Sequence, residues 1–145
     1  MNLPQDFCLK MQNLLKDEYD DFIKGYDKEN YFSLRINTLK ADSDDEKIKN
    51  LFCEEKVRWA ENGYYYSGRQ RPGKHPYHHA GAYYIQEASA MAPVARAEIQ
   101  KGDRVLDLCA APGGKSTGAA AYLEGTGLLV SNEIVPGRAK ILSGN

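Results

Sequence analysis

Long hydrophobic runs are absent from this sequence, and cysteine is scarce. No apolar stretch approaches the ~20 residues that a membrane-spanning helix needs, and residues 1–10 contain no apolar signal core. The 3 cysteines are widely spaced and form no C-x-x-C pair, which argues against a disulfide scaffold and against a zinc ribbon. We therefore expect a cytoplasmic protein with reduced thiols and no membrane association.

A large net charge is also lacking. The formal net charge is -1, and a content of 42% hydrophobic and 27% charged residues is typical of a globular protein. The charge is unevenly distributed, because residues 1–55 carry 8 Lys and Arg against 13 Asp and Glu, whereas residues 56–145 carry 11 against 7. We expect a polyanion to meet the second part of the chain first.

The first part of the chain predicts a small α/β unit. Apolar residues at helical spacing indicate a helix over residues 5–26, and alternating apolar and polar residues indicate a strand over residues 33–37. Ser43 stands three residues before Glu46, which is the reciprocal N-cap pattern, so we expect a helix over residues 44–54.

The middle of the chain is less periodic. Residues 57–60 and 64–66 flank an Asn-Gly pair, which predicts a hairpin. Residues 67–81 contain Gly, Pro and His without periodicity and indicate a linker or a functional loop. Helical spacing returns over residues 83–99, where Pro93 is expected to bend the helix.

From residue 101 the pattern changes to that of an α/β sheet. Residues 105–108 are typical of a buried strand, a Gly-rich turn follows, and residues 115–123 predict a helix of small residues. A second apolar strand covers residues 128–133, and another helix begins near Pro136. The order strand, loop, helix, strand predicts the opening βαβ unit of a doubly wound sheet.

The loop between these two strands, D-L-C-A-A-P-G-G-K-S over residues 107–116, is the most informative segment. Its small residues allow a ligand to lie against the backbone at the carboxyl end of the strand, next to the free N–H groups of the following helix. Glu133 ends the next strand 20 residues after Gly113, a spacing at which an acid meets a nucleoside ribose.

Three ligands are compatible with such a loop in principle. A nucleoside triphosphate requires G-x-x-x-x-G-K-[ST], but Cys109 stands where the first Gly is needed. A dinucleotide requires G-x-G-x-x-G, which is absent. An adenosyl cofactor without phosphates remains. The spacing alone favours two interpretations equally. One is a site for this cofactor, and the other is a plain Gly-rich turn that has an acid nearby by chance.

The same segment resembles the cofactor loop of the Sun-type family of RNA cytosine-5 methyltransferases. Further stretches agree in order with this family, and the last two resemble its bacterial ribosomal small-subunit subgroup in particular: L-R-I-N-T-L-K at 34–40, Y-I-Q-E-A-S-A-M at 84–91, N-E-I at 132–134, P-G-K-H-P at 72–76 and H-A-G at 79–81. The resemblance covers nearly all of residues 34–145 and identifies the N-terminal portion of such an enzyme.

The resemblance implies an α/β fold in two parts. Residues 1–75 would form a small α+β domain similar to RNA-recognition folds, and residues 76–100 a connecting loop and helix. Residues 101–145 would begin a Rossmann-like domain that binds S-adenosyl-L-methionine, of which only the first βαβ unit is present. Arg69, Arg71 and Lys74, which lie close to several tyrosines, would contact RNA, although a solvated basic loop fits the residues equally well.

The resemblance also implies a function, which is methyl transfer from S-adenosyl-L-methionine to C5 of a cytosine in ribosomal RNA. Asp107 would support the loop from the end of its strand. Glu133 would bind the ribose of the cofactor. The full set of cofactor-binding residues implied in this way is Cys109, Ala110, Ala111, Pro112, Gly113, Gly114, Lys115 and Glu133.

No catalytic residue is expected within these 145 residues. The family uses a Cys thiolate that attacks C6 of cytosine, and its catalytic cysteines lie downstream of the ribose-binding acid. Cys109 belongs to the cofactor loop, Cys53 to the core, and Cys8 has no activating neighbour. The alternative function is a non-catalytic remnant of such an enzyme that binds RNA or a protein partner.

No metal site is expected either. His75, His78 and His79 are close in sequence, but Pro76 denies them a common helix and no Cys lies at ligand spacing. The family resemblance places this loop near the entrance for the substrate.

Overall fold

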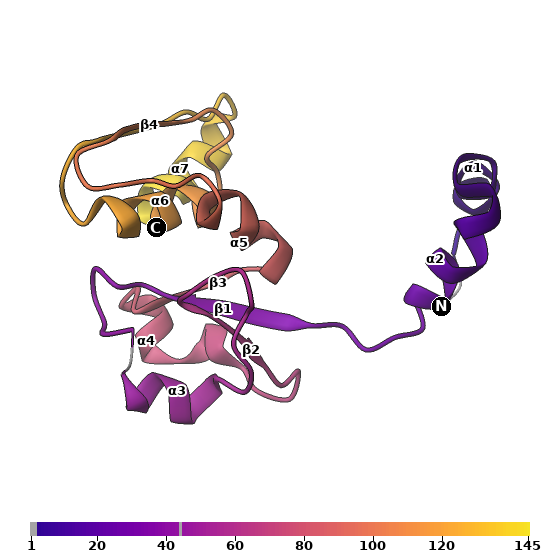
Figure 1. Ribbon diagram of the computed structural model, residues 1–145, viewed down its shortest axis with the longest axis horizontal. Helices are drawn as coiled ribbons and strands as arrows, with labels where there is room; N and C mark the ends of the chain where they lie inside the picture. The colour runs from indigo at the N-terminus through magenta and orange to yellow at the C-terminus, as the bar shows by residue number, and fades with distance from the viewer. Residues whose placement is uncertain (1–2, 44) are drawn as a thin grey trace. The chain divides into compact units, whose positions relative to one another are not determined.

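The structure is a computed structural model that describes residues 3–43 and 45–145. The described residues form two compact units that divide after Asn30. Figure 1 shows the course of the chain and labels its helices and strands. No helix within the described residues is long and apolar enough to cross a membrane.

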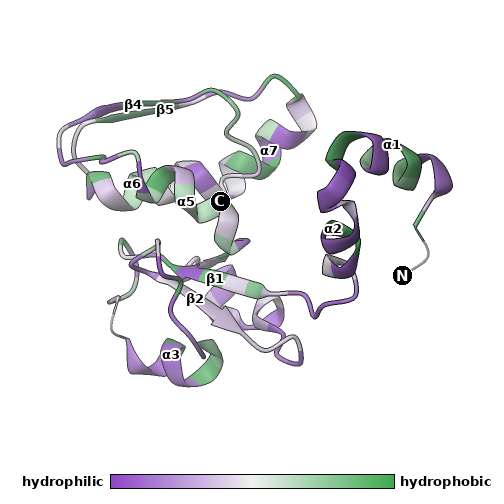
Figure 2. Cartoon of the chain, turned by 45° about the vertical axis from the view of Figure 1, so that its right-hand side comes forward, coloured by the Kyte–Doolittle hydropathy of each residue, from purple (hydrophilic) through white to green (hydrophobic). Residues whose placement is uncertain are grey.

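The first unit is helical. It contains α1 (Gln5–Leu15), the 3-10 helix η1 (Lys16–Glu18) and α2 (Tyr19–Gly25). The helical structure predicted over residues 5–26, with a further short turn at Phe22 and Ile23, is therefore confirmed. It is divided because Lys16 adopts a φ of 47° and ends α1. Both helices carry hydrophobic and hydrophilic residues (Figure 2). The rings of Phe7, Phe22 and Tyr26 lie 5.4–6.3 Å apart between centroids and pack the two helices together.

The second unit begins with an antiparallel sheet of three strands. Its order is β2 (Gly63–Tyr66), β1 (Phe32–Ile36), β3 (Tyr83–Ile85), so β1 is central. The strand predicted over residues 33–37 is confirmed. Tyr83–Ile85 was predicted to begin a helix, which is wrong, because its backbone pairs with β1 and the helix α5 covers only Ala88–Ala95.

The two faces of β1 have different surroundings, because side chains alternate along a strand. Leu34 and Ile36 are fully buried and pack with Ile48 of α3 (Glu46–Phe52). Ser33 and Arg35 point to the opposite face, on which α5 and α6 (Gly114–Leu123) lie (Figure 1). The central strand therefore places a buried cation between the sheet and α6.

The helix α3 differs from its prediction at its start. Asp45 is the N-cap residue, and its carboxylate accepts a hydrogen bond from the Lys47 amide at 2.8 Å. The expected capping by Ser43 is wrong, because the carboxylate of Asp45 lies one residue before the helix and performs that function. The predicted first helical residue, Asp44, lies outside the described residues.

The predicted hairpin and linker are also corrected. Residues 57–60 form a turn rather than a strand. The predicted antiparallel contact lies just before them, as a bridge between Lys56 and Tyr64, and Val57 N–H donates to the Gly63 carbonyl at 2.8 Å. On its other side β2 pairs with β1. Residues 67–81 contain two short helices, η2 (Pro72–Lys74) and α4 (Pro76–His79). Each begins at a proline, whose fixed φ suits the first position of a helix.

The predicted βαβ unit is confirmed. Strand β4 (Arg104–Asp107) pairs in parallel with β5 (Leu128–Ser131) through α6, and α7 (Pro136–Gly144) follows. Leu106 and Leu128 are more than half exposed. The fold class is the predicted one, α/β with the first part of a Rossmann-like sheet. The antiparallel sheet includes β3, beyond residue 75, and the predicted domain boundaries remain a proposal.

Candidate cofactor site

Asp107 organises the loop that follows β4. Its carboxylate accepts a hydrogen bond from the Ser116 hydroxyl at 2.7 Å and another from the Cys109 amide at 3.2 Å. The Ser131 hydroxyl, at the end of β5, donates to the Ser116 hydroxyl at 2.9 Å. One carboxylate therefore joins the end of β4, the loop and the first turn of α6, and Ser131 links β5 to the same group.

The loop itself is held from β5 and α7. The Ala110 amide donates to the Asn132 carbonyl at 3.0 Å, and the Asn132 side chain donates to the Leu108 carbonyl at 3.0 Å. Ala110 and Ala111 are consequently buried, whereas Leu108 and Cys109 remain exposed. The exposed backbone at the strand end is the surface on which a flat ligand can lie.

Gly113 is the residue at which the loop turns into α6. Its φ of 122° lies outside the range that residues with a side chain adopt, and a Cβ there would lie 3.3 Å from Cβ of Asn145. The first helical hydrogen bond runs from Thr117 N–H to the Gly113 carbonyl at 2.8 Å. The amides before Thr117 thus belong to a helix N-terminus, which favours negative charge, and the exposed Lys115 adds a cation there.

Arg138 connects Glu133 to the loop, because its guanidinium contacts both. The Glu133 carboxylate is buried, accepts from the Val135 amide at 3.0 Å and pairs with the Arg138 guanidinium at 3.2 Å. The same guanidinium donates to the Ala111 carbonyl at 2.7 Å. Arg138 had no predicted role. In the sequence it was visible only as one of the residues, together with Leu142, that match the family after the N-E-I segment.

These groups fit the chemistry of an adenosyl cofactor. A carboxylate has four lone-pair sites, so Glu133 keeps acceptor capacity for ribose hydroxyls besides the two bonds that it makes. The N-terminus of α6 and Lys115 suit the carboxylate of the amino-acid end of the cofactor. The predicted site residues Cys109, Ala110, Ala111, Pro112, Gly113, Gly114 and Lys115 all lie on this one loop and helix start.

Arg35 connects the antiparallel sheet to the cofactor loop and was missed by the sequence analysis. The residue is only 8% exposed. Its side chain donates from Nε to Gln86 Oε1 at 3.2 Å, and from Nη2 to the Gly114 carbonyl at 3.2 Å and to the Thr117 hydroxyl at 2.8 Å. Burial lowers the pKa of Arg35 to about 10, because it penalises the charged form. The guanidinium packs against α6 at Gly118, where an added Cβ would lie at the ordinary contact distance of 3.5 Å from it.

The cysteines have no activating surroundings. All three are free, and burial raises the pKa of the Cys53 thiol to about 11. Cys109 is exposed, and its backbone amide is bonded to Asp107. The expectation that these cysteines are not catalytic remains a prediction.

Of the three histidines between residues 75 and 79, His75 has a local structural role. His75 Nδ1 accepts from the Tyr77 amide at 3.2 Å and caps α4, and its ring lies 5.3 Å from that of Phe52. Within residues 3–43 and 45–145, no three His, Cys, Asp or Glu side chains are grouped so that they could hold a metal ion. Arg69 and Arg71 are exposed, whereas the neighbouring Tyr64 and Tyr66 pack against the core of the sheet.

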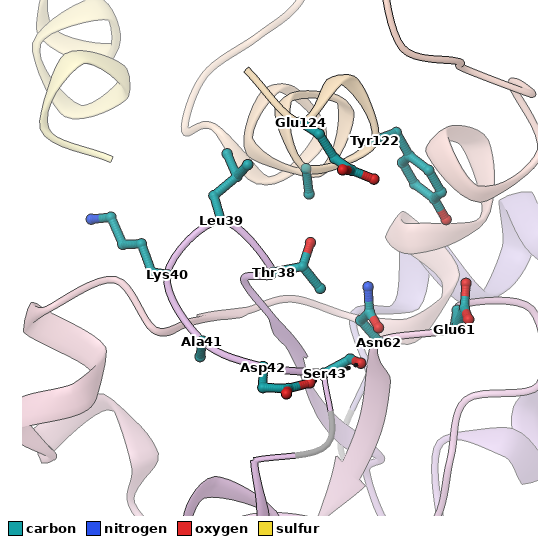
Figure 3. Close-up of a pocket in the computed structure, with 11 residues that line it drawn as sticks. Thr38, Leu39, Lys40, Ala41, Asp42, Ser43, Glu61, Asn62, Tyr122 and Glu124 are labelled. Carbon is teal, nitrogen blue, oxygen red and sulfur yellow. Dashed lines mark hydrogen bonds between the residues drawn. The ribbon is translucent and has the colours of Figure 1, made fainter. Parts of the chain in front are cut away.

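A cavity of about 830 Å³ lies away from this loop, between the segment after β1 and the C-terminal end of α6 (Figure 3). The carboxylates of Asp42, Glu61 and Glu124 line it, and Lys40 is the one basic residue among the described residues of the lining. This balance of charge disfavours a phosphate. The cofactor site is therefore assigned by the chemistry of the loop and not by the volume of this cavity.

A parallel βαβ unit with a Gly-rich loop after its first strand and an acid after its second defines the opening of a Rossmann-type domain. Comparison with protein families gives the particular group. The family model described as the N-terminal domain of 16S rRNA methyltransferase RsmF matches residues 3–88, and the model described as 16S rRNA methyltransferase RsmB/F matches residues 94–145. The chain belongs to this RsmF family, and the predicted Sun-type relationship is confirmed.

Individual relatives agree with this assignment. Ribosomal RNA small subunit methyltransferase F of Vibrio cholerae is 36% identical over 100% of the chain and 33% of its own length. The protein of the same name from a Shewanella species is 39% identical over 87% of the chain and 28% of its own length. The chain thus spans about a third of the curated relatives that it matches.

Solved structures share the fold. A methyltransferase homologue from Pyrococcus horikoshii superposes with a TM-score of 0.81 at 25% identity, covering 98% of this chain and 48% of that protein. NSun6 from the same organism, whose structure was determined with SFG, gives a TM-score of 0.79 over 97% of this chain and 61% of its own, at 16% identity.

Proposed function

We propose that this chain supplies the S-adenosyl-L-methionine site of an RNA cytosine-C5 methyltransferase that acts on ribosomal RNA of the small subunit in the cytoplasm. The observation that carries the proposal is the joining of the loop to Glu133 through Arg138, together with the support of the loop by Asp107. An acid and a Gly-rich helix N-terminus are thereby held at one edge of the parallel strands.

The roles of the loop residues follow from their positions. Cys109, Ala110 and Ala111 present backbone groups at the end of β4, and Pro112 leads the chain into the turn at Gly113. Gly114 and Lys115 begin α6 and would face the amino-acid end of the cofactor, while Glu133 would accept from the ribose hydroxyls. The cofactor supplies the methyl group. The thiolate that attacks cytosine would come from residues other than these, so we expect no methyl transfer by the 145-residue polypeptide itself.

The cofactor site is tested by the substitution Glu133→Gln. We expect the affinity for S-adenosylhomocysteine to fall roughly tenfold or more, because hydrogen bonds to a charged group contribute about 1.5–3 kcal/mol. Isothermal titration calorimetry measures the change. Glu124→Gln is the matched control, since Glu124 pairs with Lys101 at 2.6 Å and lies beyond the other end of α6. Equal affinities in the two variants would remove Glu133 from the site.

The same titration separates the rival ligands. We expect S-adenosylhomocysteine to bind and ATP not to bind, because Cys109 replaces the first Gly of a phosphate-binding loop. Binding of ATP alone would contradict the proposal. RNA binding without cofactor binding would favour the alternative of a non-catalytic RNA-binding remnant.

RNA contact by the basic segment is tested by the double substitution Arg69→Ala and Arg71→Ala. We expect the dependence of log affinity on log salt for a single-stranded RNA to flatten by roughly 1.4, because each phosphate contact contributes about 0.7 to this slope. The control is Lys24→Ala with Lys28→Ala, which removes the same charge from exposed positions of the first unit. An unchanged slope in the arginine variant would exclude this segment from the RNA surface.

A further inference from the structure

A second cavity, of about 200 Å³, lies between the antiparallel sheet, the start of α6 and the end of α7, where Gly144 and Asn145 line it. Of the eleven described residues that line it, four have basic side chains and none has an acidic side chain. The basic residues come from two segments that are distant in sequence, and they are Arg35 and Lys40 in one and His78 and His79 in the other. This composition is the reverse of that of the cavity in Figure 3, which is lined by three carboxylates.

Arg35 gives the cavity a buried positive charge. Its hydrogen-bond partners are an amide, a carbonyl and a hydroxyl, all neutral, and no carboxylate among the described residues lies within ion-pair distance of it. A buried charge is costly unless an opposite charge accompanies it. An anion in the adjacent cavity would supply that charge without disturbing the three hydrogen bonds.

His78 supplies a second observation. Its Nδ1 atom is buried and has no hydrogen-bond partner within the described part of the chain. Buried polar atoms in folded proteins nearly always have a partner. Solvent does not reach Nδ1, so a ligand pairs with it only after the ring of His78 turns toward the cavity that this residue lines. The neighbouring rings of Tyr83 and His79 lie 6.0 and 5.7 Å away between centroids.

The other two basic residues of the cavity are accessible to solvent. Lys40 and His79 are exposed, and the Lys40 ammonium already donates to the Ala80 carbonyl at 3.1 Å, which keeps it beside the cavity while leaving two of its three donors. Guanidinium, ammonium and imidazole donors therefore converge from several directions. A tetrahedral anion with several acceptor oxygens suits such an arrangement better than a planar carboxylate.

We propose that this cavity binds a phosphate group, namely a backbone phosphodiester of the RNA substrate next to the nucleotide that is methylated. This inference rests on the proposed function. Thr117, in the first turn of α6, lines the cavity and also bonds to Gly113 of the cofactor loop. A phosphodiester held here lies on the other side of that turn from the cofactor, and it positions the strand relative to the methyl donor.

The test uses two substitutions at the exposed positions, Lys40→Gln and His79→Gln, made together in the full chain. We expect the affinity for a short single-stranded RNA that contains cytidine to fall roughly tenfold, since hydrogen bonds from charged donors are lost. The salt dependence should flatten by about 0.7 for one lost phosphate contact. Lys47→Gln, an exposed lysine of α3, is the matched control and should leave both quantities unchanged.

Two further measurements separate the possible failures. The affinity for S-adenosylhomocysteine should be the same in all variants. If the double variant binds both the RNA and S-adenosylhomocysteine as the wild type does, the cavity proposal is overturned and the proposed function stands. Inorganic phosphate should shift the ring ¹⁵N resonances of His78, and the RNA should displace it. A phosphate-induced shift that RNA does not reverse would assign the cavity to a free anion and overturn the RNA part of the inference.

Discussion

Gly113→Ala will reduce the affinity for S-adenosylhomocysteine roughly 10- to 100-fold. The glycine has a φ of 122°, and an added Cβ would meet Asn145 at 3.3 Å and Leu142 at 3.4 Å. A residue with a side chain in such a conformation costs about 1–3 kcal/mol, and the loop escapes that strain only by changing its path. Because the backbone of this loop is the proposed binding surface, the change of path removes the site.

Gly137→Ala is the control for this substitution. Gly137 lies in the first turn of α7, has no atom within 4 Å of an added Cβ and does not have a positive φ. Calorimetric titration of both variants gives the affinities, and circular dichroism shows whether each is folded. Wild-type affinity in a folded Gly113→Ala variant would show that the cofactor does not depend on this conformation.

Arg35→Ala will lower the free energy of unfolding by about 3 kcal/mol. The truncation leaves a void between the sheet and α6 and removes the donor from three buried or half-buried acceptors, at Gln86, Gly114 and Thr117. Urea denaturation measures the loss. Arg69→Ala removes the same side chain from an exposed position and should change the stability by less than about 0.5 kcal/mol.

Arg35→Met separates the two causes of this loss. Methionine fills much of the volume but donates no hydrogen bond, so a stability midway between wild type and Arg35→Ala assigns the remainder to the bonds. Wild-type stability of Arg35→Ala would contradict the view that this side chain joins the sheet to α6. Buried arginines can be replaced by apolar residues without loss in some proteins, and the methionine variant measures that here.

Local patterns predicted much of the fold. The strand β1 and the unit from β4 to α7 were found because alternation, apolar runs and Gly-rich turns are properties of neighbouring residues. Strand β3 was missed because Tyr83–Ile85 is short, and the apolar residues that follow it have helical spacing. Its strand conformation depends on pairing with β1, about 50 residues away, which no local pattern reveals.

The sequence predicted which residues form the candidate site, but not the hydrogen bonds that connect them to the rest of the fold. The loop from Cys109 to Lys115 and the acid Glu133 were visible as a motif and a spacing. The bond from Arg138 to Ala111 spans 27 residues and that from Arg35 to Thr117 spans 82, so both depend on how the elements pack. The aromatic residues near Arg69 show the same limit, because Tyr64 and Tyr66 turned out to pack against the core.

The hydrogen bonds of Arg35 have a mechanical consequence for any enzyme that contains this chain. The strand β1 cannot shift along its axis relative to the first turn of α6 without stretching the bonds to Gly114 and Thr117. A ligand that displaces the strand therefore strains the cofactor loop, and a ligand that reshapes the loop strains the strand equally. By linkage, each ligand then changes the affinity for the other by the same factor, and a single guanidinium transmits the effect in both directions.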